Sequence, residues 1–348
     1  MLSGIVAFLV FGLIVLIHEF GHFLFAKLNG IKVVEFSIGM GPRLYSFMKG
    51  ETRYSLKILP FGGSCMMLGE DEEESDDRAF NNKSVWARIS VIAAGPVFNF
   101  ILAFLFAVII VGVAGYDPPE VAGTMEGYPA AEAGLETGDM ITRLNDQKIK
   151  TYRDVMVYLA FHQGEDLRVT YERPSVGKTY QTLITPKYSK EEGSYLMGLQ
   201  FYGTYQKTGS FMEMLEYSVY EIEYNVRSTI QGLGMLIQRK IKPEDAVAGP
   251  IKIVTMIGGT VNESRQYGLE NMLLTVCNWC LILSASLGIM NLLPIPALDG
   301  GRLVFLIIEA VRGKPVDREK EGMIHMAGMV VLMTLMVLVL FNDIKSFF

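Results

Sequence analysis

Four apolar runs, each near the length of a membrane-crossing helix, constrain this 348-residue chain more than any other feature. They occupy roughly residues 4–26, 89–114, 272–293 and 323–341. A helix needs about 20 mostly apolar residues to cross the hydrocarbon core of a bilayer. Half of the chain (50%) is hydrophobic, which is high for a soluble protein of this length. The sequence therefore predicts a polytopic α-helical membrane protein with four transmembrane spans.

Lysine and arginine residues indicate how these spans are oriented. Short cytoplasmic loops of membrane proteins carry an excess of both residues. They are frequent between the first two runs, from Lys27 to Arg88, and in the short loop between the last two runs, from Arg312 to Lys320. Both loops are therefore predicted to be cytoplasmic. Both termini and the long segment from about Gly115 to Asn271 are then extracytoplasmic.

The extracytoplasmic segment begins with a recognisable α+β unit. Short β-type runs alternate with turn signals in "VAGTMEGYPAAEAGLETGDMITRLNDQKI", and an amphipathic helix, "TYRDVMVYLAFHQ", follows. The block from Pro129 to Asp139 resembles the PDZ family in its bacterial, circularly permuted form, and the resemblance covers residues 119–203. PDZ domains bind an extended peptide as an added strand. The resemblance implies that "YLMGLQF" (Tyr195–Phe201) binds a peptide or substrate tail; a β-rich spacer without a ligand is the alternative.

Two histidines and a glutamate interrupt the first apolar run. On a helix, His18 and His22 lie one turn apart on the same face, so their imidazoles can grip one metal ion. Glu19, beside them, can hold and deprotonate a water molecule. This is the HExxH arrangement of zinc metalloproteases. Histidines satisfied by hydrogen bonds within a helix bundle are the alternative, but ionisable groups inside a membrane are costly and usually mark function.

A catalytic zinc site usually has three protein ligands. The stretch "NLLPIPALDGGRLVFL" supplies a third candidate, Asp299, just after Pro294 and Pro296 break the third span. The first and third spans both run inward, so both carry these polar residues near their cytoplasmic ends. We therefore expect Asp299 to lie at the depth of His18 and His22.

Three motifs in this order resemble the site-2 protease family of intramembrane zinc metalloproteases: "HEFGH", "AGPVFNF" and "NLLPIPALDGGR". The PDZ-like insertion after the second span resembles the family's bacterial regulator-of-sigma-E protease branch, although better-known members often carry two such domains. The resemblance implies that His18, His22 and Asp299 bind Zn²⁺ and that Glu19 is the general base.

The same resemblance implies a substrate and a location. The substrate would be a single-pass membrane protein, either an anti-sigma factor already trimmed on its outer side or a remnant signal peptide. It would be cut within or near its transmembrane segment, in regulated intramembrane proteolysis. The enzyme would be a multi-pass protein of the bacterial inner or cell membrane, with its active site towards the cytoplasm.

Two other classes of function remain as alternatives. One is a non-catalytic membrane scaffold that presents a PDZ domain beside a vestigial metal site; an intact HExxH together with Asp299 argues against it. The other is a proton-coupled transporter that uses His18, Glu19 and Asp299 as a proton relay. The chain lacks the paired repeats around a midplane site that such transporters show.

Substrate contacts are expected from the first loop and from the third span. "KVVEFSI" and "RYSLKIL" predict a short, membrane-associated β-hairpin, whose edge at Val33, Val34 and Phe36 could pair with an unwound substrate. A plain surface hairpin is the alternative. Asn291 could hold the other side of the substrate, because an amide both donates and accepts hydrogen bonds. A hydrogen bond between helices is the alternative for Asn291.

The predicted organisation has four parts. They are an N-terminal membrane part (1–114), the PDZ-like domain (119–203), an amphipathic membrane-surface linker (204–270) and a C-terminal membrane part (271–348). The lipid bilayer is a partner throughout, and the net charge of −6 gives no indication of nucleic acid. Asn99 is expected to pack between helices, and His162 and His325 are expected to be ordinary surface or core residues.

Overall fold

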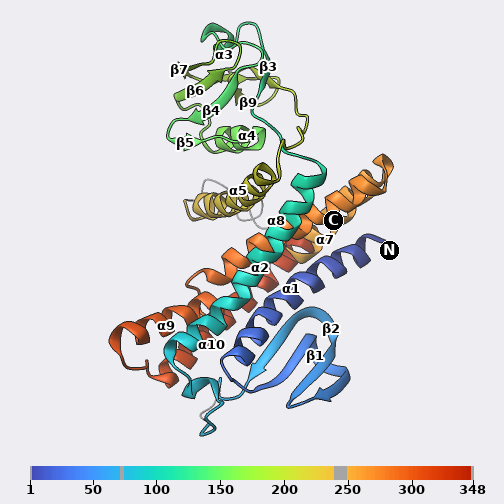
Figure 1. Ribbon diagram of the computed structural model, residues 1–348, viewed down its shortest axis with the longest axis vertical. Coiled ribbons are helices and arrows are strands. Elements are labelled where there is room, and N and C mark those ends of the chain that lie inside the picture. Colours follow the sequence, from blue (N-terminus) through green and yellow to red (C-terminus); the bar gives the residue numbers. More distant parts are fainter. Residues whose placement is uncertain (1, 71–73, 239–248, 346–348) are drawn as a thin grey trace. The chain divides into compact units, whose positions relative to one another are not determined.

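The structure, a computed structural model, describes residues 2–70, 74–238 and 249–345 (Figure 1). The chain divides into two compact units. Unit 1 combines Met1–Ile109 with Val219–Phe348, and unit 2 is the stretch Ile110–Ser218 between them. Unit 2 is therefore inserted into the sequence of unit 1, in the predicted order of membrane part, inserted domain and membrane part.

Long apolar helices dominate the membrane part. They are α1 (Leu2–Leu28), α2 (Val85–Val113), α8 (Leu269–Leu292) and α10 (Arg318–Lys345). Among the described residues, these four helices are long and apolar enough to cross a membrane. The prediction of a polytopic α-helical protein with four spans is confirmed.

Helix α1 packs against α2 and α8. Val10 and Ile14 of α1 are buried in one cluster with Leu102 of α2 and Cys280 of α8. Lipid tails are as apolar as these side chains, so close packing and dispersion hold such helices together, rather than the exclusion of water. These contacts fix the rotation of α1, and thereby the direction in which its polar side chains point.

A helix that the sequence analysis did not indicate, α7 (Pro250–Ser264), also packs on α1. Ile257 and Val261 of α7 are buried in a cluster with Ala7. This helix lies within residues 204–270, the stretch that the sequence predicts to be a membrane-surface linker. Residues 239–248 of that stretch lie outside the described residues.

The N-terminus of α7 is capped by α10. The carboxylate of Asp343, which is buried, accepts hydrogen bonds from the backbone N–H groups of Gly249, Ile251 and Lys252 at 3.0–3.2 Å. A carboxylate at this position satisfies N–H groups that have no partner within the helix, and it complements the positive end of the helix dipole. The last helix is thus fixed to the bundle near its C-terminal end.

The third span is interrupted before Asp299, as predicted. Helix α8 ends at Leu292, and α9 (Asp299–Arg312) begins seven residues later. Pro294 and Pro296 lie between the helices and have no N–H to donate. Gly301 is required behind the break, because a Cβ there would lie 2.5 Å from the carbonyl oxygen of Ile295.

Two ion pairs fix α9 to the rest of unit 1. Arg88, near the start of α2, pairs with Glu309, and both side chains are about 15% exposed or less. Arg302 pairs with Glu70, which follows the first loop's sheet. Charged groups this poorly solvated are costly unless paired, so breaking either pair is unfavourable. The two pairs therefore hold the helix that begins with Asp299.

The first loop forms a sheet from two strands, β1 (Val33–Lys49) and β2 (Thr52–Met67). The prediction of two strands is confirmed, but they are longer than a short hairpin, and each bends upon itself. Residues 33–38 pair with 63–67 on one side, residues 35–38 pair with 53–56 on the other, and residues 43–49 pair with 52–57. Gly39 and Gly41 (both φ +85°) bend β1, and Gly62 (φ +77°) bends β2.

Glu35 is a buried carboxylate in this sheet. Arg43 donates two hydrogen bonds to it, at 2.9 and 2.6 Å, and Nζ of Lys57 lies 4.0 Å away. The hydrogen bonds from Arg43 lower the pKa of Glu35 to about 2, against the opposing effect of burial. The ion pair between Glu35 and Arg43 joins the two halves of the bent strand β1.

Unit 2 is an α+β unit, as predicted. Its main sheet has the order β5 (Gln147–Lys148), β4 (Met140–Leu144), β6 (Leu167–Arg173) and β7 (Lys178–Ile184), and β3 (Val121–Thr124) pairs with β10 (Leu199–Phe201). Helix α4 (Tyr152–Phe161) begins with a capping box between Thr151 and Asp154. The core of unit 2 contains the buried residues Val121, Ala130, Leu135, Ile141, Leu144, Ile149, Val155, Tyr158, Leu167, Val169, Tyr171, Ile184 and Met197.

We expect Glu35 to make the stability of the protein depend on pH. A carboxylate whose pKa falls from 4.5 to about 2 on folding stabilises the protein above pH 4.5, and it loses this effect as the pH falls towards 2. Glu35→Gln should therefore lower the free energy of unfolding at pH 7 by about 1–3 kcal/mol, since the half-exposed Arg43 weakens the pair. The difference between the two proteins should shrink by more than half at pH 3. Thermal unfolding in detergent at both pH values measures this difference. An equal difference at both pH values would contradict the lowered pKa of Glu35.

Candidate metal centre

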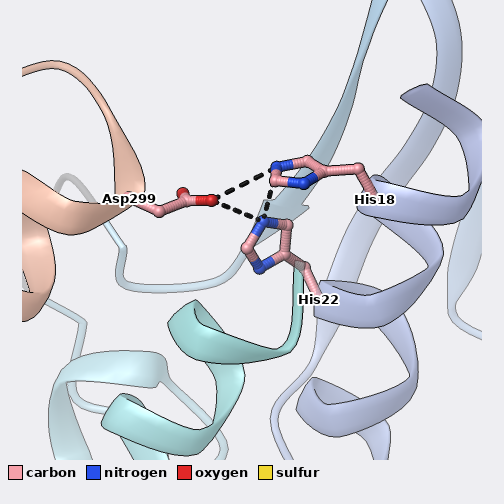
Figure 2. A group of neighbouring side chains, drawn as sticks. All are labelled: His18, His22 and Asp299. Atoms are coloured by element: carbon pink, nitrogen blue, oxygen red, sulfur yellow. Dashed lines mark hydrogen bonds and ion pairs between the residues drawn. The ribbon is translucent and has the colours of Figure 1, made fainter. Parts of the chain in front are cut away.

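His18, His22 and Asp299 meet at one point in unit 1 (Figure 2). Nε2 of His18 lies 3.2 Å from Nε2 of His22 and 3.2 Å from Oδ2 of Asp299. Nε2 of His22 lies 3.4 Å from the same carboxylate oxygen. The two histidines are 8% and 7% exposed. The first span and the break in the third span therefore bring the three predicted ligands together.

The spacing of these three atoms fits a zinc ion. In a tetrahedral site with metal–ligand distances of about 2.0–2.1 Å, two ligand atoms lie about 3.3 Å apart. The observed distances of 3.2, 3.2 and 3.4 Å match this value. In the described part of the chain, Oδ2 of Asp299 is buried without a hydrogen bond and approaches only these two imidazole nitrogens. Two imidazoles and one carboxylate form a donor set typical of catalytic zinc.

Hydrogen bonding to His22 fixes the tautomer that a metal requires. Nδ1 of His22 lies 2.9 Å from the carbonyl oxygen of Val91 in α2. Because a carbonyl oxygen only accepts hydrogen bonds, Nδ1 must carry the proton. The lone pair of the neutral ring is then on Nε2, which faces His18 and Asp299. Such an outer hydrogen bond orients a metal-binding histidine.

His18 has its outer contact with Asn99, also in α2. The Asn99 side chain is fully buried, and its Nδ2 lies 3.2 Å from Nδ1 of His18. In this orientation Oδ1 of Asn99 has no hydrogen-bond partner within the described residues. A half-turn of the amide exchanges its oxygen and nitrogen, so that Oδ1 accepts a hydrogen bond from Nδ1–H and the lone pair on Nε2 of His18 is free to bind a metal. Asn99 is therefore more than the packing residue that the sequence analysis expects.

One face of α2 provides all of these contacts. Val91, Gly95 and Asn99 recur every four residues, so they lie on the same face of the helix. A Cβ at Gly95 would lie 2.8 Å from Cε1 of His18, and one at Gly21 of α1 would lie 2.8 Å from the carbonyl carbon of Ala94. Only glycine at both positions allows the two helices to approach this closely. The motif "AGPVFNF" could have indicated that Asn99 faces the metal centre, because Gly95 and Asn99 are four residues apart and share one face of the helix.

Glu19 lies beside the three ligand atoms but is not one of them. Its carboxylate interacts electrostatically with His22, His18 and Asp299. A Cβ at Gly63 of β2 would lie 2.8 Å from Cγ of Glu19, so the sheet of the first loop runs directly past this residue. A carboxylate next to a metal site, but outside the ligand set, is placed to hold a water molecule and accept its proton.

The predicted substrate-binding residues of the first loop lie in the interior of the sheet. Val33 is buried, and Phe36 is 8% exposed with its ring centroid 5.2 Å from that of Phe23. Phe36 pairs with Cys65 on one side and Tyr54 on the other. A strand segment that is paired on both sides cannot accept a further strand, so Phe36 is not available as a pairing edge. Val33 pairs with Met67 on one side, and Val34 is 38% exposed.

Two further residues, Asn291 and His325, lie close to the break in the third span. Asn291 is at the end of α8. Within the described residues, no hydrogen bond joins its side chain to another helix. His325 of α10 accepts a hydrogen bond from the backbone N–H of Ala297. No sequence motif includes His325, which was expected to be an ordinary surface or core residue.

Unit 2 contains a groove of about 700 Å³ between α4 and the stretch that includes β9 (Ser194–Leu196) and β10. Its apolar lining includes Met156, Leu159 and Met197. The stretch "YLMGLQF" borders the groove, but it is two short strands separated at Met197 and Gly198 rather than one continuous strand.

Two solved domains are similar to part of this chain. The PDZ domain of an SdrC-like protein from Listeria monocytogenes is 23% identical and covers 25% of this chain and 90% of that domain, with a TM-score of 0.22. The second domain of another Listeria protein is 24% identical and covers 24% of this chain, with a TM-score of 0.21.

Comparison with protein families covers nearly the whole chain. The model of Peptidase family M50 matches residues 6–335. The zinc metalloprotease RasP of Geobacillus kaustophilus is 33% identical across 100% of this chain and 99% of that protein. The regulator of sigma-W protease RasP of Bacillus subtilis is 31% identical across 99% of both chains. The resemblance to site-2 proteases is thereby confirmed, and a scaffold or a transporter is excluded. The chain belongs to Peptidase family M50 and is a zinc metalloprotease of the membrane.

Proposed function

We propose that His18, His22 and Asp299 are the ligands of the catalytic Zn²⁺ and that Glu19 is the general base. The observation that carries the proposal is the triangle of ligand atoms, 3.2, 3.2 and 3.4 Å apart, beside the Glu19 carboxylate. A zinc ion bound there supplies a polarised scissile carbonyl and a water molecule with a pKa near 7. Glu19 takes the proton of the attacking water and then delivers it to the nitrogen of the leaving amine.

We propose that the substrate is a single-pass membrane protein cut within or near its transmembrane segment. The apolar surroundings of His18 and His22 in a membrane-spanning helix support this, because a substrate must reach the same depth. The Bacillus subtilis relative is a regulator of sigma-W protease, which supports an anti-sigma factor as the substrate; a remnant signal peptide is the alternative. The distribution of lysine and arginine supports a site that faces the cytoplasm and a PDZ-like domain outside the bacterial cell membrane.

A transmembrane helix must unwind before it can be cut, since its carbonyl groups are bonded within the helix. We propose that the outer edge of the first-loop sheet, residues 63–67, pairs with the unwound substrate. These residues have a strand partner on one side only, and Gly63 lies against Glu19. Val33, Val34 and Phe36 support this edge from behind rather than forming it. Asn291 would satisfy freed backbone groups on the other side of the substrate.

The roles of the ligands and of Glu19 can be separated by substitution. Glu19→Gln should keep about one zinc ion per chain but lower the cleavage rate by at least about 100-fold, because the base is lost and the ligands remain. His22→Ala should lose zinc as well as activity. Zinc analysis of the purified protein and cleavage of a membrane substrate in detergent measure both effects. His162→Ala in unit 2 is the matched control, and full activity of Glu19→Gln would contradict the mechanism.

Asn291→Leu should lower kcat/KM by about tenfold without loss of zinc, because a buried backbone group of the substrate loses its hydrogen bond. Helix-breaking residues near the scissile bond of the substrate should raise the rate, since less of the helix must be unwound. Asn271→Leu, at the opposite end of α8, is the control. If cleavage responds neither to Asn291 nor to the helicity of the substrate, the substrate is opened in another way.

We propose that the groove of unit 2 binds a peptide or the tail of a substrate. Its apolar lining between α4 and the short strands β9 and β10 supports this proposal. Deleting residues 119–203 should raise the rate of cleavage of an untrimmed substrate relative to a trimmed one. Met156→Lys in the groove should do the same if binding is responsible, whereas Val176→Lys, exposed in the turn between β6 and β7, should not. An unchanged ratio after the deletion would show that the unit does not select substrates.

A further inference from the structure

The loop that precedes Asp299 contains a residue in an unfavourable backbone conformation. Ala297 has φ +77°, in the left-handed region that residues other than glycine rarely adopt. It lies in the break between α8 and α9, two residues before the carboxylate that completes the metal centre. Such a conformation persists only where surrounding contacts enforce it. The contacts that enforce it therefore bear directly on the position of Asp299.

One of these contacts comes from the last membrane helix. Nδ1 of His325 in α10 accepts a hydrogen bond of 3.0 Å from the backbone N–H of Ala297. The imidazole is 17% exposed, and its ring centroid lies 5.5 Å from that of Phe305 in α9. The ring is thus held between the loop and the helix that begins with Asp299.

A second contact lies one turn further along α10. Gly328 is three residues after His325 and shares its face of the helix. A Cβ at Gly328 would lie 2.6 Å from the carbonyl oxygen of Pro296. At this distance the two atoms would clash, and the backbone would have to move. Glycine therefore lets α10 approach the loop closely enough for His325 to reach Ala297. Two independent features of α10 thus act on adjacent residues of the loop.

We propose that α10 is a latch that positions the third metal ligand, with His325 and Gly328 holding the loop in the conformation that presents Asp299. The proposal rests on the assignment of Asp299 as a zinc ligand. Only one residue separates Ala297 from Asp299, so a change of the Ala297 backbone to a common conformation redirects the carboxylate. Metal–ligand distances tolerate only about 0.2 Å. His325 is a positioning residue, which acts through the backbone of Ala297 and touches neither substrate nor metal.

Zinc affinity of the full-length protein in detergent, measured by competition with a chromogenic chelator, tests the latch. His325→Leu should raise the zinc dissociation constant about tenfold. His325→Asn should stay within about twofold of the native protein, because Oδ1 of asparagine occupies the place of Nδ1 and can accept the same hydrogen bond. The visible spectrum of the Co²⁺-substituted protein should change in His325→Leu and not in His325→Asn. Native affinity and an unchanged spectrum in His325→Leu would overturn the proposal.

The close approach at Gly328 is tested independently, with a variant that leaves His325 in place. Gly328→Ala should weaken zinc binding as His325→Leu does, because the added methyl group pushes α10 from Pro296. Gly322→Ala is the matched control, since it brings the same gain in helix propensity, and no described atom lies within 4 Å of a Cβ there. Equal zinc affinity of Gly328→Ala and Gly322→Ala would overturn the proposal even if His325→Leu did not fold.

A double variant tests whether His325 acts through the backbone of Ala297. Glycine adopts positive φ readily, so Ala297→Gly should make the hydrogen bond less necessary. His325→Leu should then raise the zinc dissociation constant by no more than about threefold in the Ala297→Gly protein. The same tenfold loss in both backgrounds would overturn the proposed route. Asp299→Ala is measured in parallel: if it binds zinc normally, the ligand assignment fails, whereas a loss only in Asp299→Ala refutes the latch alone.

Discussion

Three polar side chains, which we propose as metal ligands, converge inside an apolar helix bundle. Ionisable side chains in a membrane are unfavourable unless they are paired or bind a metal. His18, His22 and Asp299 come from segments 277 or more residues apart, yet their ligand atoms lie within 4.8 Å of one another. Helix α2 contacts the centre through Gly95 and through hydrogen bonds to His18 and His22. The metal centre is therefore the constraint that fixes how α1, α2 and the broken third span meet.

Helix α2 illustrates how little of this support involves charge. Val91 offers a backbone carbonyl, Gly95 offers the absence of a side chain, and Asn99 offers an amide, all on one face. The backbone carbonyl of Asn99 also accepts a hydrogen bond of 2.9 Å from the buried hydroxyl of Ser284 in α8. Neutral groups of this kind orient imidazoles without adding a further charge to the bundle. The same principle applies on the other side, where α10 contacts the loop before Asp299 through an imidazole and a glycine.

The sheet of the first loop places a strand edge where the chemistry occurs. Gly63 lies against Glu19, so a substrate strand paired with residues 63–67 would pass the general base. The sequence indicated strands here, but Phe36, one of the three residues predicted to form the pairing edge, is paired on both sides. Register depends on where the two long strands bend. The bends at Gly39, Gly41 and Gly62 bring distant parts of each strand together, which local alternation of residues does not reveal.

The sequence by itself determined the four spans, the inserted α+β unit and the three residues that we propose as ligands, because apolar length, turn signals and the HExxH spacing are local properties of the chain. Asp299 could be predicted from the sequence as well, since the prolines before it mark the break in the span. The roles of Asn99, Gly95 and His325 were decided only by the tertiary structure. Each acts on a residue far away in the sequence, and no local pattern encodes which helix faces pack together. The packing of neighbouring helices therefore decided which residues surround the proposed metal ligands. The sequence alone indicated the proposed ligands themselves.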